Sequence, residues 1–165
     1  MSNALPTIQL LKWIAQDIQA ARGATPAAPY QVFFEKPRTA PEGSPSDGPP
    51  GYNPPYCIVL PKTTKVSFSG LTASVLNPDQ ANEFYIYVEE PWPDDSYPIA
   101  FAKTDWANSL IAQVQTGPNY HGIGNFPLVT DVDYGDDGDP NERVWEMMMV
   151  FTLNTTASHS NSGLG

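Results

Sequence analysis

The end of the chain decides the fold: residues 131–154 read DVDYGDDGDPNERVWEMMMVFTLN. This stretch begins as an acidic, glycine-containing turn and continues as a run with apolar residues at every second position. These positions are Trp145, Met147, Met149, Phe151 and Leu153. A period of two is typical of a β-strand with a buried face. The stretch therefore predicts a hairpin, with strands near residues 128–134 and 144–155.

Two other segments have the periodicity of amphipathic helices. The first spans residues 7–22 and is followed by Gly23, a frequent residue at helix C-termini. The second spans residues 99–115 and is followed by Gly117 and Pro118, which stop a helix. Apolar residues recur four positions apart in the second segment, at Ala102, Trp106, Leu110 and Val114. We predict a helix at each segment.

Between these helices, β-branched and aromatic residues predict strands at 30–36, 56–60 and 82–90. An irregular break is expected at 61–64, and residues 65–69 extend the second strand or form an edge. Seven prolines fall within residues 37–55 and exclude a helix or a central strand there. We expect this long loop to be mobile in an isolated subunit and to be ordered only against a partner.

The predicted order is helix, three strands, helix, two strands. Such an order is typical of an α+β fold, here a mostly antiparallel sheet with both helices packed on one face. We expect a single domain at 1–156 and a flexible tail at 157–165, which is rich in Ser, Asn and Gly. The core is predicted at the apolar positions of the periodic segments: Ile14, Ile18, Val32, Ile58, Phe84, Ile86, Trp106, Leu110, Val114, Trp145, Met147, Met149 and Phe151.

The composition limits the classes of function. Only 8 Lys and Arg accompany 18 Asp and Glu, for a formal net charge of −10, so stable nucleic-acid binding by the monomer is not expected. No stretch approaches the roughly 18 continuous apolar residues of a membrane span, and the N-terminus does not resemble a signal peptide. The single cysteine, Cys57, lies in an apolar run and is predicted to be a buried hydrophobic residue.

Few side chains have the spacing of a chemical site. The acidic turn holds six carboxylates between Asp131 and Glu142, but Gly135 stands where a calcium loop that begins at Asp133 requires Asp or Asn. We therefore favour a solvated turn over a metal site. His121 and His159 are isolated, which argues against zinc and against a general base. We expect no catalytic residue, no metal ligand and no cofactor, and we do not expect an enzyme.

The element order and several local features resemble the tail-terminator family of long-tailed bacteriophages and its neighbouring neck and tail-completion proteins. The features are an N-terminal helix, a long loop between the first two strands, and a strand that ends in Val-Glu-Glu at 88–90. A helix around 106–114 follows, and then Asp131-Val-Asp-Tyr134 with an acidic turn before an aliphatic last strand. The resemblance spans about residues 7–156 and rests on order and spacing.

The resemblance implies a structural virion protein that forms a ring, expected to be a hexamer, capping the tail tube and joining it to the head connector. It implies assembly in the host cytoplasm, partners among tail-tube and neck proteins, and DNA only as passing cargo. A neck adaptor or head-completion protein of the same particle is the alternative. A metal- or carbohydrate-binding module, with aromatic residues beside carboxylates near Trp92, is an alternative of another class. The expected contact residues are Arg38, Glu42, Asp47, Tyr52, Trp92, Tyr97 and Tyr120.

Overall fold

The computed structural model describes residues 7–35, 54–68, 78–114, 121, 127–134 and 143–156. Within them the elements follow in the order α1 (Thr7–Ala21), β1 (Gln31–Phe33), β2 (Tyr56–Phe68), β3 (Pro78–Pro91), α2 (Ile99–Val114), β4 (Pro127–Asp133) and β5 (Val144–Thr156). This is the predicted order, and the α+β class is confirmed. The predicted tail at 157–165 and most of the long loop lie outside the described residues.

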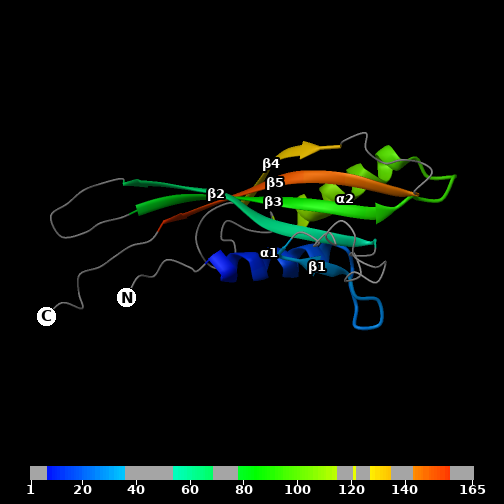
Figure 1. Cartoon of the computed structure of the whole chain (residues 1–165), viewed down its shortest axis with the longest axis horizontal. Coiled ribbons are helices and arrows are strands. Elements are labelled where there is room, and N and C mark those ends of the chain that lie inside the picture. Colours follow the sequence, from blue (N-terminus) through cyan, green and yellow to red (C-terminus); the bar gives the residue numbers. More distant parts are fainter. Residues whose placement is uncertain are drawn as a thin grey trace, which may run out of the picture.

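The strands form one mixed sheet in the order β1-β2-β3-β5-β4 (Figure 1). All neighbours are antiparallel except β1 and β2, which run parallel. The hairpin predicted from the end of the chain is confirmed as the pair β4 and β5. Parallel neighbours cannot be joined by a tight turn, because the chain has to return to the start of the next strand. A long connection between Phe33 and Tyr56 is therefore required by the topology.

The irregularity predicted at residues 61–64 is present as a shift in register, but it does not end the strand: β2 continues to Phe68, as one of the two alternatives for residues 65–69 expected. Pro61 pairs with Phe84 and Thr63 pairs with Glu83, so Lys62 is the extra residue of a β-bulge. A bulge accommodates one additional residue while the ladder of paired strands continues on both sides. The predicted strand at 30–36 also differs, since only Gln31–Phe33 pairs with β2.

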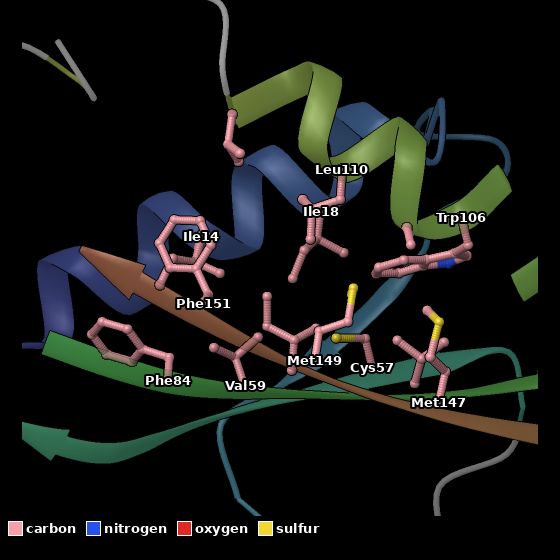
Figure 2. Packing of buried hydrophobic residues seen from close by; sticks show 14 of the residues in the cluster. Ile14, Ile18, Cys57, Val59, Phe84, Trp106, Leu110, Met147, Met149 and Phe151 are labelled. Atoms are coloured by element: carbon pink, nitrogen blue, oxygen red, sulfur yellow. The ribbon is translucent and has the colours of Figure 1, made fainter. Parts of the chain in front are cut away.

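Both helices pack on one face of the sheet, as predicted. Helix α1 contacts β1 and β2, α2 contacts β4, and the two helices contact each other. Figure 2 shows the core that results, with Ile14, Ile18, Trp106 and Leu110 of the helices facing Cys57, Val59, Phe84, Met147, Met149 and Phe151 of the sheet. The predicted core residues all belong to this cluster except two. Val32 is half-buried at its edge, and Ile58 is buried on the opposite face of the sheet.

The far end of the sheet extends past the helices as a three-stranded arm (Figure 1). The arm consists of residues 62–68 of β2, 78–82 of β3 and 154–156 of β5, which remain paired in register. Residues 64–67 are all exposed, and 52% of the surface of Val66 is accessible to solvent. The arm is therefore built from the same strands as the core, but helices do not cover it.

Candidate assembly surface

The face of the sheet opposite the helices carries an open groove of about 440 Å³, which we call the sheet-face groove. It is lined by Tyr56, Ile58, Leu60, Tyr85, Tyr87, Glu89 and Met148. Tyr56 and Ile58 are buried between their neighbours, whereas Met148 is 38% exposed. None of the described elements packs over this face. The groove thus combines three tyrosines with three aliphatic or thioether side chains, of which Tyr85, Tyr87, Leu60 and Met148 are at least partly accessible to a partner.

Strand alternation explains why the groove lies on this face. In β3, Phe84, Ile86 and Val88 are buried in the core. The residues between them, which include Tyr85 and Tyr87, line the groove because successive side chains of a strand point to opposite faces. The sequence predicts this amphipathic β3 correctly. It does not reveal the groove, because Ile58 and Met148 belong to continuous apolar runs in which both faces look like core.

Two carboxylates face each other at one end of the groove. Glu89 of β3 and Glu146 of β5 are direct partners in the register, so their side chains leave the same face of the sheet. The hydroxyl of Tyr56 donates a hydrogen bond to Glu89, and Tyr87 donates one to Glu146. Burial and the bond to Glu146 raise the pKa of Tyr87. Like charges placed directly opposite destabilise a sheet, and a cation at this end of the groove would relieve their repulsion.

A second cluster joins α1, β3 and α2 around Glu90, which is 6% exposed. Its Oε2 accepts a hydrogen bond from Arg22 at 2.7 Å, and its Oε1 accepts one from Trp106 Nε1 at 3.0 Å. The Arg22 guanidinium also lies over the Tyr30 ring, 5.1 Å from its centroid. Burial raises the pKa of Glu90 above its usual 4.5, although Arg22 and Trp106 act in the opposite direction. Perturbed carboxyls often mark active sites, but these partners occupy both oxygens and tie three elements together, so we assign the cluster a structural role.

His121 lies against α1 through contacts that the sequence does not predict. Its ring stacks on Trp13 with centroids 4.7 Å apart, and its Nε2 is 3.3 Å from Asp17 Oδ2. The partners are more than a hundred positions apart in the chain, so no local spacing indicates the pair. The contact holds His121 itself against the N-terminal helix.

Two of the predicted contact residues are described. Trp92 is half-buried and packs against the core, and its backbone N–H donates to the carbonyl of Arg143. Tyr97 is 40% exposed; its hydroxyl donates to Asp105 and its ring meets Phe101 edge-on. The others, Arg38, Glu42, Asp47, Tyr52 and Tyr120, lie outside the described residues. An interface role for these seven residues stays a prediction.

Other kinds of site find little support in the described part of the chain. Within it, no three His, Cys, Asp or Glu side chains gather as a metal site would require. Asp131 and Asp133 are exposed on β4, and the rest of the acidic turn is not described. Cys57 is buried as predicted, and burial raises the pKa of its thiol. No described helix is long and apolar enough to cross a membrane.

Comparison with known proteins does not assign the chain: it matches no family model and no curated protein. The described residues form an α+β fold in which helices cover one sheet face and no described element covers the other.

Proposed function

We propose that the protein is a structural subunit of a bacteriophage particle, similar to a tail terminator. Copies of it form a ring, expected to be a hexamer, that caps the tail tube and joins it to the head connector. The observation that carries the proposal is the sheet-face groove, where Tyr85, Tyr87 and Met148 lie on an open face. Exposed aromatic and apolar clusters of this kind are typical of protein interfaces, in which Tyr and Met are enriched.

The charge of the chain agrees with this function. A formal net charge of −10 disfavours retention of DNA on the protein surface. A ring subunit through which DNA passes has to avoid strong phosphate binding, because DNA must move through the opening. The acidic composition therefore supports DNA as passing cargo, with proteins as the binding partners.

The mass of the purified protein in solution tests the proposal. We expect light scattering coupled to size exclusion to give a multiple of the 18.0 kDa chain, and negative-stain images to show rings with a central opening. Met148→Lys places a charge in the groove and is expected to abolish the association. Ile8→Lys is the matched control, because Ile8 is 62% exposed on α1, away from the groove.

Binding to partner proteins gives the second measurement. A tail terminator binds assembled tail-tube protein, whereas a neck adaptor binds the head connector, so pull-down with each protein separates the two roles. A wild-type chain that stays monomeric at raised concentration and binds neither protein contradicts the proposed function.

A further inference from the structure

We infer that the arm of one copy inserts into the sheet-face groove of the next copy, with Lys65 of the arm approaching Glu89 and Glu146. This inference rests on the proposed assembly into a ring and names the two surfaces that meet. It requires three things: an arm with an unpaired, exposed strand edge, a groove of complementary charge, and a distance that prevents the contact within one chain.

The β2 strand of the arm is largely exposed, since residues 64–67 are all exposed, whereas Asn82 at the base of the arm is buried. Beyond Ile58, β2 is paired with β3 but no longer with β1, so its outer edge is open through residues 62–68 within the described sheet. An open strand edge and an uncovered two-sided ribbon are marginally stable in water and are common sites of pairing between chains. Val66, 52% exposed near the end of β2, leaves the opposite face of the arm from Lys65, so it is not part of the surface that meets the groove.

The arm also carries exposed positive charge, which is scarce in this chain. The described cations are Lys12, Arg22, Lys62, Lys65, Lys103 and Arg143. Arg22 is bound to Glu90, and Lys103 is buried with its ammonium on the Tyr134 carbonyl. Lys12 and Arg143 are exposed elsewhere on the molecule. Lys62 and Lys65 lie on the arm, where Lys62 bridges to Glu83 at 3.4 Å and Lys65 is exposed.

The groove complements this surface in charge and in chemistry. The opposed pair Glu89 and Glu146 places two carboxylates beside the tyrosine rings. The bulge at Lys62 puts Lys65 on the groove face of the sheet. Lys65 pairs with Ala81, and Ala81 belongs to the same alternating set of β3 side chains as Glu83 and Glu89. A lysine can lay its aliphatic stem along the tyrosines and bring its ammonium to the carboxylates.

One chain cannot make this contact with itself. Lys65 pairs with Ala81, eight residues along β3 from Glu89, which is about 26 Å at 3.3 Å per residue. A lysine side chain is much shorter than this distance. The arm and the acidic end of the groove are therefore two different surfaces that meet only between copies. Such a heterologous contact generates a ring when the rotation between copies closes.

Charge reversal tests the pairing in the full-length protein. Lys65→Glu and Glu146→Lys are each expected to weaken self-association at least tenfold, as measured by sedimentation velocity. An equimolar mixture of the two variants is expected to regain the wild-type mass, because each arm then meets a groove of opposite charge. Lys12→Glu makes the same charge change on an exposed position of α1 and is expected to leave the assembly intact.

Circular dichroism melts of each single variant check that the monomer remains folded, as both positions lie on the surface side of the sheet. If the wild type and both single variants all form rings, the arm-and-groove contact is wrong, but the proposed function still stands. The same holds if both variants are monomeric and their mixture stays monomeric, or if Met148→Lys abolishes assembly and Lys65→Glu does not. A wild-type monomer that binds no tail or neck protein overturns the proposed function itself.

Discussion

At the scale of single residues, Glu90 is a buried carboxylate whose two oxygens both accept hydrogen bonds. Its position at the end of β3 brings it between Arg22 from the end of α1 and Trp106 from the middle of α2. Burial of a carboxylate is costly unless it is paired and hydrogen-bonded, and here both compensations are present. This residue therefore links the two helices to the sheet at one point.

Glu90→Gln is expected to gain stability relative to the wild type as the pH rises. The folded pKa of Glu90 is raised above 4.5, so the stability that its bound proton contributes is present below that pH and is lost as the pH rises through the raised value. Glutamine does not titrate and lacks this loss. Urea denaturation of both proteins at several pH values between about 4 and 7 measures the difference in unfolding free energy. A difference that moves in favour of the wild type as the pH rises would mean that Arg22 outweighs burial.

Trp106→Ala is expected to lower the free energy of unfolding by about 3–5 kcal/mol, because it leaves a cavity in the core. The side chain is 2% exposed and also donates to Glu90. Phe101→Ala is the control on the same helix. Its ring is 59% exposed, so its loss is expected to change the free energy by less than about 1 kcal/mol. Equal melting of Trp106→Ala and the wild type would contradict the packing of α2.

At the scale of the elements, the periodicity of apolar residues is enough to predict a helix or strand where one face of the segment is buried. Both helices and β5 lie close to their predicted bounds because their apolar residues recur at 3.6 or at 2 positions, whereas β3 begins at Pro78, four residues before the predicted start. The parallel pairing of β1 with β2 was not predictable, since three residues carry no periodic signal and the partner is set by tertiary contacts. The sequence predicts an irregularity at residues 61–64 but does not show that it is a one-residue bulge through which the pairing of β2 with β3 continues.

The candidate surface was predictable only in part. The alternation of Tyr85 and Tyr87 with core residues indicates an amphipathic strand, which is half of the groove. The opposition of Glu89 to Glu146 depends on the register between β3 and β5, which are separated by α2 and β4 in the chain. No spacing within the sequence encodes that register. The Arg22 and Glu90 pair escaped prediction for the same reason.

Shortening the arm is expected to separate folding from assembly. Replacing residues 66–80 by Asn-Gly joins the paired residues Lys65 and Ala81 through a two-residue hairpin turn. None of the described residues that are replaced belongs to the core cluster, so the thermal melting point is expected to change by only a few degrees. Self-association measured by sedimentation is expected to be lost. A variant that no longer folds would show that the arm supports the sheet.

At the scale of the whole molecule, charge distinguishes the expected partners. The chain carries a formal net charge of −10, and on the described surface its exposed lysines include two on the arm. The protein as a whole therefore repels polyanions, and in the proposed assembly Lys65 of the arm meets the acidic end of the groove of another copy. This combination favours association between copies over adhesion to DNA.

We expect no stable complex with double-stranded DNA, even at low salt, where phosphate binding is strongest. An electrophoretic mobility shift experiment at about 20 mM salt measures this, with Lys65→Glu as a variant of still lower positive charge. Self-association is expected to weaken as salt is added, because the lysine and the carboxylates are screened over a Debye length of about 8 Å at 0.15 M. A DNA complex that persists through this range would contradict a cargo role for DNA.

The bulge at Lys62 determines which face of the sheet each later side chain of β2 occupies. Before the bulge, Cys57 and Val59 face the core; after it, the even-numbered Thr64 and Val66 continue that side, and Lys65 emerges on the other. The extra residue therefore decides which face each later side chain of β2 occupies. Without it, Lys65 would lie on the helix side of the sheet and Val66 on the groove side. Insertion or deletion of one residue here would invert the arm's chemistry while leaving its composition nearly unchanged.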